Sequence, residues 1–207
     1  MRRPEFIARQ SRCPSGLLGW VIGQIMSVET AAANDAALAA LALELGDRVL
    51  EVGFGHGRTV ERAAAMVPEG FVAGIDASME MVRMATRRCR RLVGAGRVRL
   101  ALADGASLPY ADASFDKGYT VHTMYFWKDP GQHLRELGRV LRDGGRLVLG
   151  FHAKKEAVAA AFPASVYTFY GMDEVRRLLE EAGFVGVEME HAAGEVGLAI
   201  ARTRRSV

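Results

Sequence analysis

The chain has 207 residues, of which half are hydrophobic and a quarter are charged, and its formal net charge is +3. This length and composition predict one globular domain whose core is large enough to fold without disulfides or a structural metal. The small net charge does not imply a nucleic-acid or membrane surface. The two distant cysteines, which form no C-x-x-C pair, indicate neither a disulfide framework nor a zinc site.

Residues 1–33 are predicted to form a helical extension that caps the main domain. Pro4 marks a helix start, and Pro14 breaks that helix before a second one begins. Asn34 or Asp35 is expected to cap a third helix, which is rich in Ala and Leu and runs to about residue 45. Such an extension is well placed to cover the open side of a binding site.

A short apolar strand at residues 49–52 leads into a glycine loop, and a helical pattern follows at residues 59–66. Glycine lacks a Cβ, so the loop can adopt positive φ and lets a ligand approach the backbone closely. The helix start adds unpaired N–H groups. A dinucleotide-binding loop needs its third glycine at position 58, where Arg58 stands. The glycines of this loop are Gly53, Gly55 and Gly57.

Strands and helices then alternate along the chain. Strands are expected at residues 71–76, 98–102, 115–121 and 146–151, and helices after the N-caps Ser78 and Asp129. The C-terminal part is expected to hold a short helix at 154–161, an aromatic segment at 162–170, a helix at 172–182 and strands at 185–190 and 195–201, joined by a turn at 193–194. These elements predict an α/β fold, a Rossmann-like three-layer sandwich. Its mostly parallel seven-stranded sheet ends in an antiparallel hairpin, with residues 34–202 as the single domain and 203–207 as a basic tail.

Three acidic residues stand at the ends of the first three strands of the main domain: Glu51, Asp76 and Asp104. Ligands of an open parallel sheet bind outside the carboxyl ends of the strands, where these carboxylates converge. Carboxylates repel a pyrophosphate but suit hydroxyls, an exocyclic amine and positive charge. The pattern therefore favours a cationic nucleoside over NAD.

Two further motifs follow in register. Residues 104–116 have the pattern D-x-x-x-L-P-x-x-D-x-S-F-D, and residues 139–147 have the pattern R-V-L-x-x-G-G-R-L. With these motifs the chain resembles the class I S-adenosylmethionine-dependent methyltransferases, above all their small-molecule, type 11-like group. The resemblance runs from about residue 45 to residue 151 and fits more loosely beyond. It implies S-adenosyl-L-methionine as cofactor, S-adenosyl-L-homocysteine as product, and a small-molecule methyl acceptor.

The resemblance also implies roles for individual residues. The methionine part of the cofactor would be held by Glu51, Gly53, Gly55 and Gly57. Asp76, next to Ala77, would accept both ribose hydroxyls, and Met79 would pack on the adenine. The adenine edge would be recognised by Asp104 with the backbone of Gly105 and Ala106, and Thr120 would line the sulfonium.

Methyl transfer needs a base only when the acceptor must lose a proton. The candidate is His122, which follows the strand at residues 115–121, although a purely structural role fits it equally well. An acceptor pocket is expected between this stretch, the N-terminal cap and the aromatic segment. Its candidate residues, many of which fit equally well as core residues, are Trp20, Tyr125, Trp127, Tyr167 and Tyr170.

The leading hypothesis is a cytoplasmic enzyme, monomeric or homodimeric, that methylates O or N, and less readily C, of a small and partly hydrophobic molecule. Methylation of RNA or protein is the first alternative, and it is disfavoured because the basic residues form no continuous run. A catalytically silent, cofactor-binding interaction module is the second. An NAD-dependent oxidoreductase fits least. We expect no metal, no nucleic-acid partner and no membrane association.

Overall fold

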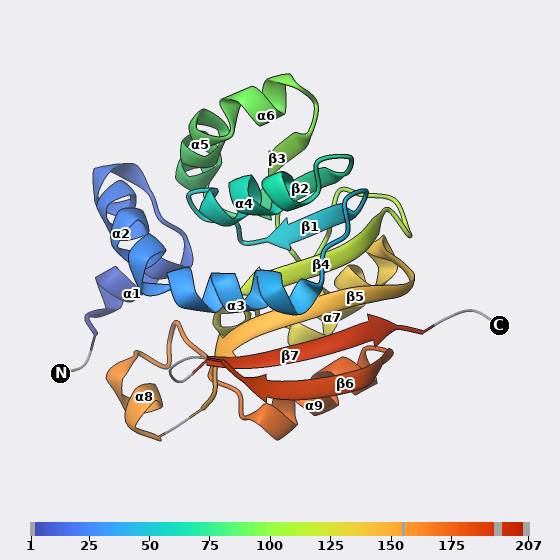
Figure 1. Ribbon diagram of the computed structural model, residues 1–207. Coiled ribbons are helices and arrows are strands. Elements are labelled where there is room, and N and C mark those ends of the chain that lie inside the picture. Colours follow the sequence, from blue (N-terminus) through green and yellow to red (C-terminus); the bar gives the residue numbers. More distant parts are fainter. Residues whose placement is uncertain (1–2, 155, 193–195, 205–207) are drawn as a thin grey trace.

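The computed structural model describes residues 3–154, 156–192 and 196–204. The strands form one sheet in the order β3-β2-β1-β4-β5-β7-β6 (Figure 1). Neighbouring strands from β3 to β5 are parallel, and β7 pairs antiparallel with both β5 and β6. The predicted fold class is confirmed. The strands are β1 (Arg48–Val52), β2 (Phe71–Asp76), β3 (Val98–Leu102), β4 (Phe115–Val121), β5 (Leu141–His152), β6 (Phe184–His191) and β7 (Val196–Thr203).

Helices cover both faces of this sheet (Figure 1). Successive side chains of a strand point to opposite faces, so Val49 joins the core beneath α3 and α4, whereas Leu50 joins the core beneath α7. Both side chains are fully buried, as expected for a parallel sheet with helices on each face. The helices of the domain are α3 (Ala31–Leu41), α4 (Arg58–Met66), α5 (Met79–Arg88), α6 (Arg90–Gly94), α7 (Pro130–Val140), α8 (Glu156–Ala161) and α9 (Met172–Glu181).

Two predicted helix caps are confirmed, and both fix helices beside the carboxyl edge of the sheet. Ser78 Oγ accepts a hydrogen bond of 3.2 Å from the backbone N–H of Met81 at the start of α5. Asp129 Oδ1 accepts one of 2.9 Å from Gln132 at the start of α7. Each cap satisfies a backbone donor that the first turn of a helix leaves free.

The predicted boundaries of α3 are wrong. The residue before this helix is Thr30, and Asn34 lies inside it, where its side-chain amide donates to the backbone carbonyl of Thr30. The helix ends at Leu41 because Ala42 adopts a left-handed conformation with φ of +50°. The Ala-rich composition therefore favoured the helix but did not mark its ends.

The C-terminal elements agree with the predicted order and differ at their ends. β5 begins at Leu141, five residues earlier than expected, because Leu141 pairs with Phe115 across an irregularity in the ladder. β7 includes Thr203, the first residue of the predicted tail, which pairs with Phe184. The turn expected at 193–194 and residues 205–207 of the tail lie outside the described residues.

The two helices expected in the N-terminal extension are α1 (Glu5–Arg12) and α2 (Gly16–Glu29). They lie at the carboxyl end of β1 (Figure 1). The segment between them is attached to the domain, because Ser78 Oγ donates a hydrogen bond of 2.5 Å to the carbonyl of Pro14. Within the described part of the chain, no helix has the length and apolar character needed to cross a membrane.

Candidate functional site

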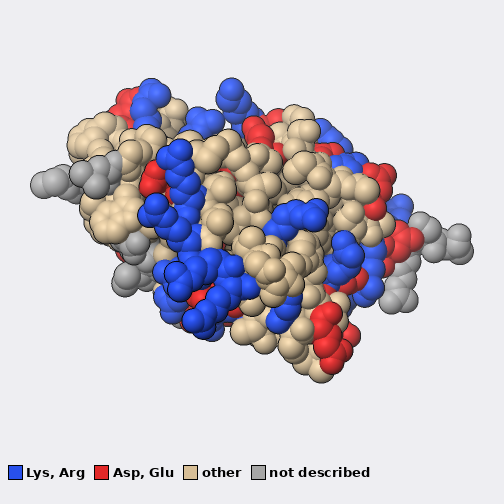
Figure 2. Space-filling model, turned by 90° about the horizontal axis from the view of Figure 1, so that it is seen from above, with Lys and Arg blue, Asp and Glu red and all other residues tan. Residues whose placement is uncertain are grey.

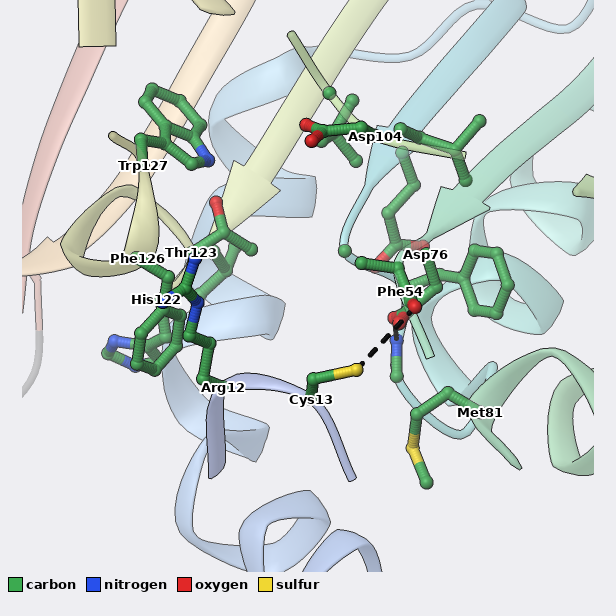
Figure 3. A pocket seen from close by; sticks show the side chains of 18 of the residues that line it. Arg12, Cys13, Phe54, Asp76, Met81, Asp104, His122, Thr123, Phe126 and Trp127 are labelled. Carbon is green, nitrogen blue, oxygen red and sulfur yellow. Dashed lines mark hydrogen bonds between the residues drawn. The ribbon is translucent and has the colours of Figure 1, made fainter. Parts of the chain in front are cut away.

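A cavity of about 740 Å³ lies outside the carboxyl ends of β1, β2 and β4 and is also lined by the segment between α1 and α2. It stands where the strand order reverses between β1 and β4, the usual ligand position in an open parallel sheet. Figure 3 shows Asp76 and Met81 on one side of this cavity, His122 and Phe126 on the other, and Arg12 and Cys13 between them. The predicted site residues that line it are Glu51, Gly53, Gly55, Asp76, Ala77, Asp104, Gly105, Ala106, His122 and Trp127.

The glycine loop between β1 and α4 has positive φ at all three glycines, +79° at Gly53, +55° at Gly55 and +83° at Gly57. A Cβ at Gly55 would meet nothing within 4 Å, so the backbone there is open to a ligand. A Cβ at Gly57 would lie 2.6 Å from the Cβ of Ala85. Gly57 therefore permits close packing of the loop against α5, and it is absent from the cavity lining.

Asp76 ends β2 and points its carboxylate at the glycine loop. Oδ2 accepts a hydrogen bond of 2.8 Å from the N–H of Gly55, and Oδ1 accepts one of 2.8 Å from Ser78. Burial raises the pKa of Asp76 to about 6, although these two N–H bonds oppose the shift. Each oxygen keeps a further acceptor position, so the group can bind two hydroxyls at once.

Glu51 is the second-last residue of strand β1, just before the loop, and is only 4% exposed. Tyr119 on the neighbouring strand β4 donates a hydrogen bond of 2.6 Å to Oε2 of Glu51. Burial raises the pKa of Glu51 to about 8, even though the Tyr119 hydroxyl stabilises the carboxylate. A cationic group beside Glu51 would favour its ionised form.

Asp104 follows β3 and has an exposed side chain. Oδ1 accepts a hydrogen bond of 2.9 Å from the N–H of Ala106 and lies 3.5 Å from Nε2 of His133. His133 stacks on Trp127 with ring centroids 4.7 Å apart. At this end of the cavity, the carboxylate of Asp104 therefore lies beside a flat wall formed by the rings of Trp127 and His133. Such an arrangement suits a heteroaromatic ring.

His122 stands just after β4 with φ of +57°, an uncommon conformation for a residue other than glycine. Its Nδ1 lies 3.0 Å from the hydroxyl of Tyr125, and its ring stacks on His152 at 4.6 Å. Burial and His152 lower the pKa of His122 to about 3. The imidazole is therefore neutral at physiological pH.

Several predicted site residues lie away from the cavity. Met79 is 47% exposed, and Thr120 is buried, where its Oγ1 donates to the carbonyl of Val52. Trp20 is exposed on α2. The remaining three of these residues are Tyr125 and Tyr167, which belong to the core beneath α7 and α9, and Tyr170, which packs against that core.

Sequence reasoning missed other lining residues, among them Arg12, Phe54, Met81, Thr123 and Phe126. For one of them a signal was present, because Met81 and Ala85 are spaced as the buried face of a helix and Met79 is not. For Arg12 the sequence carries no such signal, since its place depends on how the N-terminal segment meets the domain.

Comparison with known proteins identifies the family. Residues 50–149 match the family model described as "Methyltransferase domain". The 27-O-demethylrifamycin SV methyltransferase of Amycolatopsis mediterranei is 34% identical over 69% of this chain. An uncharacterised 37.1 kDa protein in transposon TN4556 of Streptomyces fradiae is 32% identical over 95% of this chain. Residues 50–149 therefore form a methyltransferase domain of the class I S-adenosylmethionine-dependent type.

A solved structure agrees with this assignment at the level of the fold. A SAM-dependent methyltransferase from Aquifex aeolicus superimposes on this chain with a TM-score of 0.74 and 24% identity, covering 87% of this chain and 96% of that one. The chain spans 56% of the rifamycin relative and 59% of the transposon protein. Its match to these relatives therefore concerns about half of their length.

The residues around the cavity fit the cofactor of the family. Asp76 keeps acceptor positions for a pair of hydroxyls, Asp104 presents an acceptor beside a flat apolar wall, and Glu51 is buried at the end of β1. A nucleoside that carries a sulfonium and an ammonium group complements these three carboxylates, whereas a pyrophosphate does not. Among the described residues, no group of three or more His, Cys, Asp or Glu is arranged to hold a metal ion.

Proposed function

We propose that this methyltransferase transfers the methyl group of S-adenosylmethionine to an oxygen or nitrogen of a small, partly hydrophobic acceptor, with carbon less favoured. The observation that carries the proposal is the set of strand-end carboxylates Glu51, Asp76 and Asp104 around one cavity beside the glycine loop. The rifamycin relative, whose name places its methylation on an oxygen of a small molecule, supports the choice of acceptor class.

The proposal gives each of the cofactor-facing residues a role. Asp76 binds the ribose hydroxyls, Asp104 and the backbone of Ala106 bind the adenine edge, and Glu51 faces the cationic methionine part. Gly53 and Gly55 let the loop approach the cofactor. Met81, which lines the cavity on the same side as Asp76, takes the packing role that the sequence assigned to Met79.

The bound sulfonium supplies an activated methyl group. The protein then has to hold the acceptor in line with the methyl carbon and exclude water, and such positioning lowers a barrier by on the order of 7 to 11 kcal/mol. His122 is the candidate catalytic residue, since it lines the cavity opposite Asp76. Its pKa of about 3 makes it a weak base, because a general base works best with a pKa near the working pH.

Calorimetric titration with S-adenosylhomocysteine tests the proposal. We expect saturable binding at one site per chain, and no binding of NAD under the same conditions, because the carboxylates repel its pyrophosphate. Transfer of a labelled methyl group from S-adenosylmethionine to a small-molecule fraction of a cell extract, and not to its RNA or protein, tests the acceptor class. Absence of S-adenosylhomocysteine binding would contradict the proposal.

The affinity for S-adenosylhomocysteine is expected to rise with pH between 6.5 and 8. Glu51 is mostly protonated below its pKa of about 8, and the cofactor's ammonium group favours the ionised form, so binding below that pH releases a proton. The rise should reach roughly tenfold over this range. Titrations at four pH values measure it, and Glu51→Gln, which cannot ionise, should lose most of the slope. An equal slope in both proteins would remove Glu51 from the cofactor site.

Methylation of RNA is the alternative that the surface allows us to weigh. Figure 2 shows Lys and Arg side chains on the face that carries α5 and α6, in one dense group and several separate patches with acidic side chains between them. Two arginines of α5 lie near acids: Nη1 of Arg88 is 3.5 Å from Oε2 of Glu61, and Nη1 of Arg83 is 3.9 Å from Oε2 of Glu80. Such partly neutralised patches favour a solvated surface over a phosphate-binding stripe.

A further inference from the structure

The hydroxyl of Tyr125 determines which nitrogen of His122 carries the proton. Tyr125 Oη accepts the backbone N–H of His152 and lies 3.0 Å from Nδ1 of His122. The hydroxyl has one proton, and within the described part of the chain Nδ1 is the only acceptor recorded within hydrogen-bond distance of it. Tyr125 therefore donates to Nδ1, and the neutral ring of His122 carries its own proton on Nε2.

This arrangement makes His122 a hydrogen-bond donor toward the cavity. His122 lines the cavity, and its Nε2 has no hydrogen-bond partner among the residues that the structure describes. The ring stacks on the ring of His152, and the backbone of His122 is fixed by the bond of 2.8 Å from its N–H to the carbonyl of Gly150. An Nε2–H group can bind an acceptor oxygen, but it cannot take a proton from it.

A cation faces the same end of the cavity. Arg12 is the last residue of α1 and lines the cavity. Figure 3 shows its side chain extending toward Thr123 and His122. The guanidinium makes no hydrogen bond or ion pair with any described residue. A guanidinium with free donors matches a planar oxyanion such as a carboxylate.

Two other titratable residues of the lining, His56 and Cys13, do not supply a base at this end. Burial, Arg88 and Arg58 lower the pKa of His56 to about 4, so it is a weak base as well. Burial and Asp76 raise the pKa of the Cys13 thiol, whose Sγ lies 3.5 Å from the carbonyl of Ala77, on the cofactor side. The end of the cavity around His122 thus offers a cation and an N–H donor.

We propose that the acceptor is methylated on an oxygen that is already anionic, and that the carboxylate of a small aromatic acid fits the site best. Phe126, which lies beside His122 in the lining, supplies an apolar wall for its ring. This inference rests on the proposed function.

Arg12 and His122 Nε2–H hold the carboxylate, and a lone pair of one oxygen forms the bond to the methyl carbon. The bond from that carbon to sulfur breaks, and its electron pair goes to sulfur. A carboxylate and a sulfonium give a neutral ester and a neutral thioether, so no proton moves.

The tautomer of His122 is measured by long-range ¹H–¹⁵N NMR on protein labelled with ¹⁵N-histidine, with His122→Gln to assign the signals. We expect the proton on Nε2 in the wild-type protein at pH 7. In Tyr125→Phe the donor to Nδ1 is lost, so the signals should shift toward a mixture of tautomers. A wild-type spectrum with the proton on Nδ1 would overturn the inference, because Nε2 would then be free to act as a base.

The acceptor class is measured with two matched probes, benzoate and benzyl alcohol, titrated into protein saturated with S-adenosylhomocysteine. We expect benzoate to bind at least tenfold more tightly, and Arg12→Gln to remove most of that preference. Arg9→Gln is the matched control, since Arg9 lies on the same helix, pairs with Glu5 and is outside the cavity lining. It should leave the preference unchanged.

The outcomes separate the two proposals. Equal binding of the two probes by the wild-type protein would overturn the anionic acceptor. A loss of S-adenosylhomocysteine affinity in Arg12→Gln, with the benzoate preference intact, would assign Arg12 to the cofactor's carboxylate and overturn its acceptor role. Failure of the wild-type protein to bind S-adenosylhomocysteine at all would contradict the proposed function itself.

Discussion

Replacing Asp76 by Ala is expected to weaken binding of S-adenosylhomocysteine by about 1.5 to 3 kcal/mol, or roughly 10- to 150-fold. In the proposed complex, the carboxylate of Asp76 accepts both ribose hydroxyls. It also orders the loop, because it accepts the N–H of Gly55 and of Ser78. Charge-assisted hydrogen bonds of this kind are about twice as strong as neutral ones. Isothermal titration calorimetry at pH 7.5 measures the loss directly.

Two variants calibrate this result. Asp76→Asn keeps an acceptor oxygen and the side-chain volume, so it should lose less affinity than Asp76→Ala. Asp104→Ala removes a largely exposed carboxylate, whose hydrogen bonds compete with water, and should cost only about 0.5 to 1.5 kcal/mol. If the Asp76→Ala variant binds S-adenosylhomocysteine with the wild-type affinity and melts at the wild-type temperature, Asp76 does not belong to the cofactor site.

The strand-end carboxylates and the glycine loop were predictable from sequence because the signals are local. Residues 49–52 form an apolar run that ends in a glycine turn, and Ser78 and Asp129 are strong N-cap residues at the starts of amphipathic helices. Since parallel strands share one carboxyl edge, finding the strands was enough to bring Glu51, Asp76 and Asp104 to one cavity.

The acceptor end was less predictable because it depends on contacts between distant segments. Pro14 lies 64 residues from Ser78, which holds it by a hydrogen bond, and Arg12 enters the cavity as a consequence. Tyr125 and Tyr167 are residues of a type that suits a pocket wall, yet they belong to a core cluster. Their rings contact those of Phe126, Phe162 and Phe169, mostly at tilted or perpendicular angles. An aromatic residue packs equally well in a core or against a ligand, so residue type alone does not separate the two.

A buried ion pair at the opposite, amino edge of the sheet was not predicted either. Lys117 on β4 and Asp47 before β1 have side chains only 10% and 6% exposed, and their charged atoms lie 2.7 Å apart. Lys117 Nζ also donates to the carbonyl of Ala42, just after α3, and Asp47 accepts the N–H of Glu44. The pair thus connects the end of α3 to the two central strands of the sheet.

Replacing Lys117 by Met is expected to lower the free energy of unfolding by about 3 kcal/mol, because Asp47 is left buried without its counter-ion. Urea denaturation followed by circular dichroism measures this loss.

The double variant Lys117→Met with Asp47→Asn should be more stable than Lys117→Met alone, since no uncompensated charge remains. Lys154→Met, at an exposed position, is the control and should change stability by less than about 0.5 kcal/mol. Affinity for S-adenosylhomocysteine should stay at the wild-type value in all folded variants, because the pair lies at the edge of the sheet away from the cavity. A loss below about 1 kcal/mol in Lys117→Met would show that this pair is not a main tie between α3 and the sheet.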